Sequence, residues 1–101
     1  MREAGTLLVE LLENQKVERV YCVPGESYLS VMNGLQETSI DTILCKHEGA
    51  AAIMAEADGK LTGRPGIAFV TRGPGATNAA AGVHIAQQDS TPMILFVGQI
   101  G

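Results

Sequence analysis

Clustered basic residues and long apolar runs are both missing from this sequence, and each absence excludes a class of protein. The 101 residues carry a formal charge of −4, and their seven basic side chains are scattered along the chain. Binding to a nucleic-acid backbone needs a basic stripe, so this kind of partner is not expected. The longest apolar strip near the C-terminus covers residues 93–97, which is too short for a membrane span or a signal sequence.

Cysteine is also scarce. Cys22 and Cys45 each fall in a segment with the pattern of a buried strand. Two such thiols favour reduced core residues over a disulfide framework, and we therefore expect a cytoplasmic protein. The length and an apolar fraction of 46% are typical of one compact soluble domain and exclude two.

Helical and strand patterns alternate along the chain with short connections. Helices are predicted over residues 6–15, 27–36, 48–62 and 76–88, and strands over 19–23, 40–45, 67–71 and 93–97. In the second helix Ser27 is the expected cap, with Leu29, Met32 and Leu35 on the buried side. This order predicts an α/β fold, a parallel sheet with helices on both faces. Because residues 98–101 follow a strand directly, we expect a truncated domain.

Polar and glycine-rich segments follow the first three predicted strands. They are residues 24–27, 47–49 and 71–78. Ligands of open parallel sheets gather at the carboxyl ends of the strands. The predicted fold therefore brings these three segments together at one edge, which is the candidate site.

Glu48 is the first candidate for chemistry because it lies where a buried strand passes into an alanine-rich helix. Partial desolvation there predicts a raised pKa, so that the carboxyl holds or shares a proton near neutral pH. The alternative is an ordinary first-turn acid at a helix N-terminus, and position alone favours it. Glu26 is either a solvated acid ahead of the second helix or a second carboxylate that divides proton-transfer roles with Glu48.

A zinc-protease motif is incomplete in this sequence. His47 and Glu48 begin the pattern, but Ala51 stands where the second histidine is required. His84 lies far along the chain and is more typical of an ordinary helix residue. No metal ligands are therefore predicted.

A dinucleotide-binding loop is incomplete as well. Gly73 and Gly75 open a helix as such a loop does, but Asn78 stands where the third glycine belongs. The simpler interpretation is a tight turn in which Gly75 relieves a steric clash.

Five motifs occur together in this chain. They are VYCVPG at residues 20–25, HEGAA at 47–51 with AEA at 55–57, TGRPG at 62–66, VTRGPGATN at 70–78, and DSTP at 89–92 leading to GQ at 98–99. In this order they resemble the N-terminal pyrimidine-binding domain of thiamine diphosphate enzymes of the acetolactate synthase and pyruvate decarboxylase superfamily. The resemblance covers the whole chain, residues 1–101, and implies the thiamine diphosphate-binding fold.

The resemblance assigns a catalytic role to Glu48. In the family the corresponding glutamate hydrogen-bonds N1′ of the cofactor's aminopyrimidine and favours the tautomer that takes the proton from C2 of the thiazolium ring. It implies an enzyme that acts on 2-keto acids, with acetolactate-synthase-like carboligation as the first choice. The residues implied to bind the cofactor are Pro24, Gly25, Glu26, Glu48, Thr71, Pro74, Gly75 and Asn78.

Family members are several times longer than this chain, so the resemblance implies further parts. Their diphosphate is held through Mg²⁺ by a separate C-terminal domain, and the site forms between subunits of a homodimer or larger assembly. Some synthases also carry FAD in a middle domain. The chain alone is therefore not expected to be active. Glu26 and Arg72 depart from the smaller residues usual in synthases, which leaves decarboxylase, lyase or another carboligase open.

Two alternative functions remain open from the sequence. One is a short non-catalytic module that pairs with a separately encoded diphosphate-binding subunit. The other is a dinucleotide-binding half-domain, for which the only support is the incomplete glycine loop.

Overall fold

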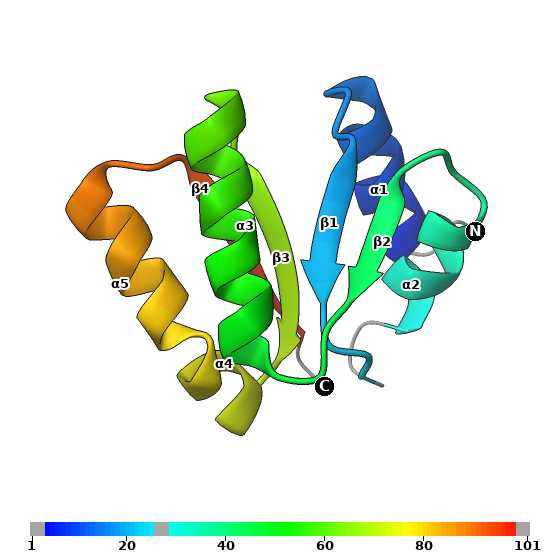
Figure 1. Cartoon of the computed structure of the whole chain (residues 1–101). Coiled ribbons are helices and arrows are strands. Elements are labelled where there is room, and N and C mark those ends of the chain that lie inside the picture. The colour runs from blue at the N-terminus through cyan, green and yellow to red at the C-terminus, as the bar shows by residue number, and fades with distance from the viewer. Residues whose placement is uncertain (1–3, 26–28, 99–101) are drawn as a thin grey trace.

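The computed structural model describes residues 4–25 and 29–98, and within them a parallel sheet of four strands forms the centre. In chain order the elements are α1 (Ala4–Asn14), β1 (Arg19–Cys22), α2 (Leu29–Gln36), β2 (Asp41–Leu44), α3 (Glu48–Thr62), β3 (Gly66–Thr71), α4 (Pro74–Asn78), α5 (Ala80–Asp89) and β4 (Met93–Gly98). The order across the sheet is β2, β1, β3, β4, and all neighbours are parallel (Figure 1).

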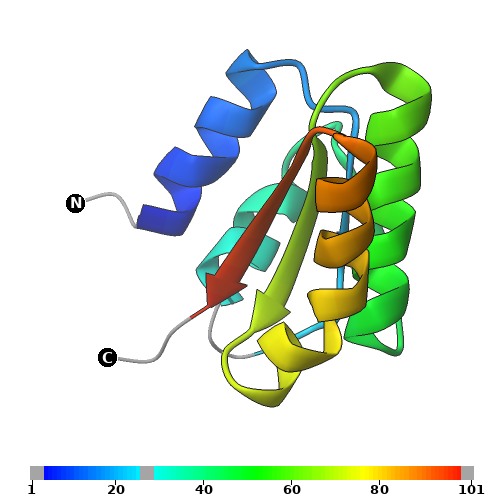
Figure 2. The ribbon, with the colours of Figure 1, turned by 90° about the vertical axis from the view of Figure 1, so that its left-hand side faces the viewer.

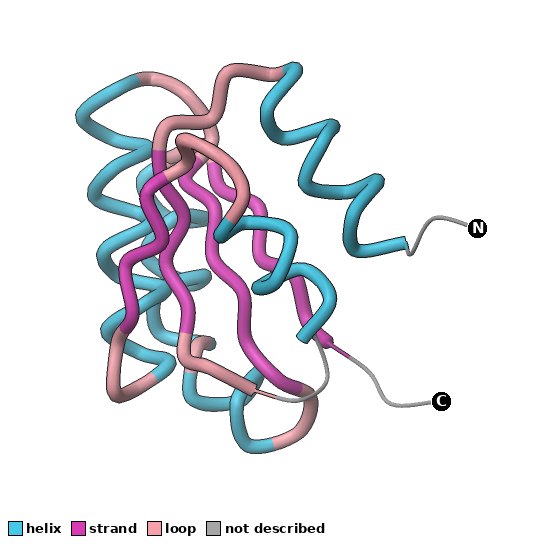
Figure 3. Tube along the Cα trace, turned by 90° about the vertical axis from the view of Figure 1, so that its right-hand side faces the viewer, coloured by secondary structure: helices cyan, strands magenta, loops and turns pink. Residues whose placement is uncertain are grey.

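Helices cover both faces of this sheet. α1 and α2 pack against each other on one face, while α3 lies along β1 and β3 on the other face with α5 beside it. Figure 2 and Figure 3 show the sheet between the two helical layers. The predicted α/β fold is therefore confirmed. Parallel neighbours require this arrangement, because each connection must cross a face of the sheet to start the next strand at the same end.

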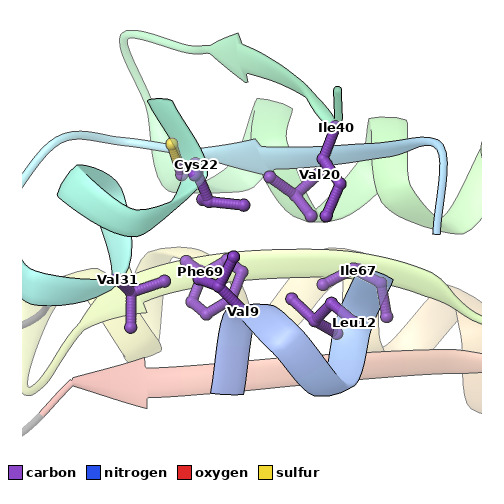
Figure 4. Packing of buried hydrophobic residues seen from close by; sticks show 9 residues of the cluster. Val9, Leu12, Val20, Cys22, Val31, Ile40, Ile67 and Phe69 are labelled. Atoms are coloured by element: carbon purple, nitrogen blue, oxygen red, sulfur yellow. The ribbon is translucent and has the colours of Figure 1, made fainter. Parts of the chain in front are cut away.

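The face under α1 and α2 holds the large side chains of the core. In Figure 4, Val9 and Leu12 of α1 lie against Phe69 and Ile67 of β3. The ring of Phe69 is 2% exposed and stacks on Phe96 of β4 with the centroids 4.8 Å apart. Burial of one such aromatic side chain contributes about 1.5–3 kcal/mol to folding. The buried members of this cluster are Val9, Leu12, Val20, Cys22, Val31, Leu35, Ile40, Ile67 and Phe69.

The face under α3 is packed through small residues instead. Ala51, Ala52 and Ala55 are fully buried there. Gly66 of β3 lies so close to Ala55 that a Cβ on Gly66 would collide with the alanine's backbone carbonyl. Alanine keeps a high helix propensity while allowing this short approach. The close packing fixes the position of α3, and with it that of its first residue, Glu48.

The helix predicted over residues 76–88 is in fact two helices. α4 begins at Pro74, where the missing N–H of proline is harmless in a first turn. The chain then turns at Ala79, and α5 begins at the next residue. Gly82 of α5 lies so close to Ala52 of α3 that a side chain there would collide with it. The turn lets α5 run along α3 while α4 stays at the end of β3 (Figure 1).

The buried side of α2 was predicted correctly in part. Leu35 is buried and Met32 packs against the same cluster, as predicted, but Leu29 is 54% exposed and Val31 is buried in its place. Val31 and Leu35 are one helical turn apart, so they form the stripe that faces the core. The expected cap, Ser27, lies outside the described residues.

Both cysteines are free, as predicted, but their surroundings differ. Cys22 is fully buried in β1, and burial raises the pKa of its thiol to about 11. Cys45 is only half-buried, because it follows the exposed edge strand β2 instead of lying within a buried strand. In the part of the chain that the structure describes, no helix combines the length and the apolar character needed to cross a membrane.

Candidate functional site

The carboxyl ends of β1 and β3 lie side by side where the chain changes direction across the sheet. From β1 the chain crosses to β2 on one side, and from β2 it crosses back to β3 on the other side of β1. Such a switch point leaves a crevice between the loops that follow the strands. The connections after all three strands lie at this end, at the bottom of Figure 1. These are the segments predicted to form the site.

His47 fixes the start of α3, and therefore the position of Glu48. Its backbone is extended, with φ −145° and ψ 139°, and its Nδ1 accepts a 2.9 Å hydrogen bond from the backbone N–H of Gly49. This is an N-cap, and an Nδ1 that accepts carries no proton. Across residues 4–25 and 29–98, no group of three or more metal-binding side chains is found.

Asn78 contacts Glu48 across 30 positions of sequence. Its Nδ2 donates a hydrogen bond of 3.1 Å to Oε1 of Glu48. A Cβ on Gly75 would lie 3.5 Å from the other carboxylate oxygen, Oε2, and 2.6 Å from Oγ1 of Thr71. Four of the predicted site residues, Glu48, Thr71, Gly75 and Asn78, therefore meet at one place. The interpretation that Gly75 relieves a steric clash is confirmed.

The predicted rise in the pKa of Glu48 is wrong for this chain. The pKa lies below its ordinary value of 4.5, first because the hydrogen bond from Asn78 stabilises the charged carboxylate. The backbone of Glu48 acts in the same direction, while burial opposes both and is weaker. The side chain is half-open at the first turn of α3, where an acid interacts favourably with the helix N-terminus. The alternative interpretation, a first-turn acid, describes this carboxyl better.

The other predicted residues lie on the rim of the same edge. Pro24 and Gly25 follow β1, and Pro74 is the first residue of α4. Pro24 and Pro74 are exposed, as is Arg72 in the turn after β3. Glu26 lies outside the described residues.

Two interactions of the site were missed by sequence reasoning. The first is the cap from His47, for which the available signal is a polar side chain directly before a helix that opens with Glu-Gly. The second is the bond between Asn78 and Glu48. No local sequence pattern predicts this hydrogen bond, because only the packing of α4 against the first turn of α3 brings the two side chains together.

Comparison with known proteins now identifies the family. The family model described as the thiamine pyrophosphate enzyme, N-terminal TPP binding domain, matches residues 2–101. The chain belongs to this family. It is a thiamine diphosphate-binding N-terminal domain of the acetolactate-synthase-like enzymes, as its motifs predicted.

Named relatives of this thiamine diphosphate-binding domain include several enzymes. The chain is 39% identical over 94 residues to acetolactate synthase of Bacillus subtilis, which covers 93% of the chain and 16% of the relative. It is 39% identical over 92 residues to a protein named probable 2-ketoarginine decarboxylase of Pseudomonas aeruginosa, covering 91% and 16%. Pyruvate oxidase of Lactiplantibacillus plantarum is 37% identical over 100 residues, covering 97% and 17%. The chain thus spans about a sixth of the length of these relatives.

The groups at the carboxyl edge of the sheet fit the pyrimidine half of thiamine diphosphate. Glu48 supplies a carboxylate with one oxygen already bonded by Asn78. Beside the other oxygen lies Gly75, and a Cβ on this glycine would stand 3.5 Å from Oε2 and 2.6 Å from Oγ1 of Thr71. A carboxylate acceptor is the group that suits a flat heterocycle carrying a protonated ring nitrogen and an amino group.

A cavity of about 330 Å³ lies elsewhere, at the amino end of the strands. It is lined by apolar side chains from α1, β3 and β4, including Leu12, Ile67 and Ile94. At its rim the guanidinium of Arg64 donates to the backbone carbonyls of Gln15 and Lys16, which follow the end of α1. This cavity is at the opposite end of the sheet from Glu48, so we do not assign the cofactor to it.

Proposed function

We propose that this domain binds the aminopyrimidine ring of thiamine diphosphate at the carboxyl edge of its sheet, and that Glu48 hydrogen-bonds N1′ of the ring. One observation carries the proposal. Asn78 occupies Oε1 of Glu48, while Oε2 faces the side of Gly75, which has no side chain. One acceptor of the carboxylate is thereby kept for a ligand. The other residues that we assign to the cofactor are Pro24, Gly25, Glu26, Thr71 and Pro74.

Glu48 holds or shares the proton at N1′ in this proposal. In the chain alone its pKa is lowered, so the group is a carboxylate near neutral pH. Covering of the carboxylate by a bound ring withdraws it from water, which acts to raise its pKa. The same residue then exchanges a proton with N1′ as a general acid and base. When bound, the cofactor supplies the electron sink that 2-keto acid chemistry requires.

The whole enzyme acts, in our proposal, on a 2-keto acid. Acetolactate-synthase-like carboligation is the first choice, and decarboxylation is the second because one relative bears a decarboxylase name. The diphosphate and its Mg²⁺ belong to another domain, either on the same polypeptide or on a separate subunit, and FAD belongs to a middle domain where one is present. Residues 1–101 then form the pyrimidine-binding domain, or part of it, in a cytoplasmic homodimer or larger assembly.

The test is Glu48→Gln in the assembled enzyme loaded with thiamine diphosphate. Glutamine keeps the size of the side chain but does not exchange a proton, so we expect hydrogen–deuterium exchange at C2 of the cofactor to slow by at least about 100-fold. The matched control is Glu37→Gln, an exposed residue directly after α2, which should leave the exchange rate unchanged. An unchanged rate in Glu48→Gln, with the cofactor still bound, removes Glu48 from this role.

A further inference from the structure

The backbone of Asn78 is anchored beside Glu48 independently of the bond between their side chains. Asn78 is the last residue of α4, and the N–H of the following Ala79 bonds back to the carbonyls of Gly75 and Ala76. Its own carbonyl faces the first turn of α3, where a Cβ on Gly49 would lie 3.3 Å from it. α4 therefore packs tightly against the turn that carries Glu48. This packing fixes the distance between the backbone of Asn78 and Glu48, which the Asn78 side chain spans.

The orientation of the Asn78 amide follows from chemistry. An ionised carboxylate only accepts hydrogen bonds, so the group that faces Oε1 of Glu48 must be the NH₂ of the amide. An amide does not titrate in the working range of pH. Asn78 therefore remains a donor to the carboxylate throughout this range, which a histidine or an acid at this position would not do.

The two oxygens of Glu48 have different surroundings as a result. Oε1 accepts the hydrogen bond from Asn78 at 3.1 Å. Oε2 lies on the side of Gly75, where even the first atom of a side chain would stand 3.5 Å away. Oε1 is thus engaged by Asn78, whereas Oε2 lies beside a residue that has no side chain.

We propose that Asn78 is a positioning residue that holds Oε1 of Glu48, so that Oε2 is the oxygen presented to the pyrimidine. This inference rests on the proposed function, and it assigns Asn78 to Glu48 instead of to the cofactor. Without the amide, the carboxylate turns about its terminal bond and the two oxygens become interchangeable. The hydrogen bond that stabilises the charged form is lost as well, so the pKa of Glu48 rises.

The test uses two substitutions in the assembled enzyme. Asn78→Ala removes the amide, and Asn78→Asp keeps its shape but replaces the donor by a second carboxylate. Asn33→Ala removes an exposed amide from α2 and is the matched control. The first readout is the titration of the Glu48 carboxylate band in infrared spectra of the cofactor-free enzyme, with the Glu48→Gln spectrum subtracted to identify that band.

We expect the titration midpoint of Glu48 to rise in Asn78→Ala and to rise further in Asn78→Asp, because a nearby like charge disfavours ionisation. Asn33→Ala should match the parent enzyme. The rise in Asn78→Ala distinguishes the two roles, because this variant adds no charge and a merely structural role leaves the midpoint of Glu48 at the parent value. The second readout is the rate of C2 exchange on the bound cofactor, which should fall by about tenfold or more in Asn78→Ala.

Failure of this inference is distinguishable from failure of the proposed function. If Glu48→Gln slows C2 exchange while both Asn78 variants leave the rate and the midpoint of Glu48 unchanged, the positioning role is overturned and the proposed function stands. If Glu48→Gln leaves exchange unchanged, both are overturned. Should Asn78→Ala fail to fold, Asn78→Ser replaces it in the same titration, because serine also removes the amide without adding a charge.

Discussion

Thr91 and Glu56 are joined by a hydrogen bond of 2.8 Å from the threonine hydroxyl to Oε1 of the carboxylate. Glu56 lies in α3 and is only 5% exposed, while Thr91 lies between α5 and β4. Lys60 pairs with the same carboxylate at 3.3 Å and with Asp89 at the end of α5. The buried carboxylate of Glu56 therefore links the segment before β4 to α3, the helix that begins with Glu48.

Replacement of Thr91 by valine keeps the shape of the side chain and removes this donor. Because Glu56 is buried, the lost hydrogen bond to a charged group should lower the free energy of unfolding by about 1–3 kcal/mol. Urea unfolding followed by circular dichroism measures the change. Thr42→Val in the edge strand β2 is the control, with an expected change within about 0.5 kcal/mol. Equal midpoints for the parent and Thr91→Val would show that the hydroxyl contributes nothing.

Gly75→Ala tests whether the position beside Glu48 has to lack a side chain. The new Cβ would lie 2.6 Å from Oγ1 of Thr71 and 3.5 Å from Oε2 of Glu48. We expect cofactor affinity to fall roughly tenfold, as the space kept for the ring is filled, together with a stability loss of about 1–3 kcal/mol from overpacking. Titration calorimetry and thermal unfolding measure the two effects.

The double variant Gly75→Ala with Thr71→Ala separates these causes. Removal of Oγ1 relieves the clash, so stability should return toward that of Thr71→Ala alone, while the Cβ beside Glu48 remains and the affinity stays below that of Thr71→Ala alone. Equal affinity in the double variant and in Thr71→Ala would contradict the proposed placement of the ring.

Cys22 makes the stability of the fold depend on alkaline pH. Burial raises the pKa of its thiol from 9.0 to about 11 in the folded chain. Between these values the unfolded thiol loses its proton while the folded one keeps it, so the unfolded state is favoured as pH rises. We expect the free energy of unfolding to fall by up to about 2–3 kcal/mol between pH 8 and pH 11 from this group. Cys22→Ala should flatten this part of the curve more than Cys45→Ala, and identical slopes in both variants would exclude the explanation.

Asp58 contributes to the raised pKa of Tyr21. The phenol donates to Asp58 Oδ2 at 3.2 Å, and Arg19 pairs with Oδ1 at 3.2 Å. Burial is the largest cause of the raised pKa of Tyr21, and the charge of Asp58 adds to it. Asp58→Asn should therefore lower the pKa of Tyr21 without restoring the ordinary value. Ultraviolet titration against the Tyr21→Phe variant measures this, with the exposed Asp41→Asn as control. A pKa that stays the same or rises in Asp58→Asn contradicts the assigned cause.

Much of the fold was predictable from local patterns, with errors where packing decides. The third strand was predicted over residues 67–71 and runs Gly66–Thr71, because five consecutive buried residues mark a central parallel strand. The fourth helix was predicted as one segment, yet it turns at Ala79. Alanine stands at the turn itself and is the best helix former, so propensity does not predict the turn at that residue. Beyond the turn Gly82 packs closely against α3, a contact that a local pattern does not contain.

The candidate site was likewise predictable from the sequence only in part. The sequence by itself predicted the segments at the carboxyl edge, because a parallel fold places them after strands that end together. The resemblance of its motifs predicted the family and proposed Glu48, Gly75 and Asn78 as site residues. Only the tertiary structure decided how they act on one another. The bond from Asn78 lowers the pKa of Glu48, whereas its place at the start of a buried helix predicted a rise. A pKa depends on distances of a few ångströms between groups far apart in the chain, and packing alone sets those distances.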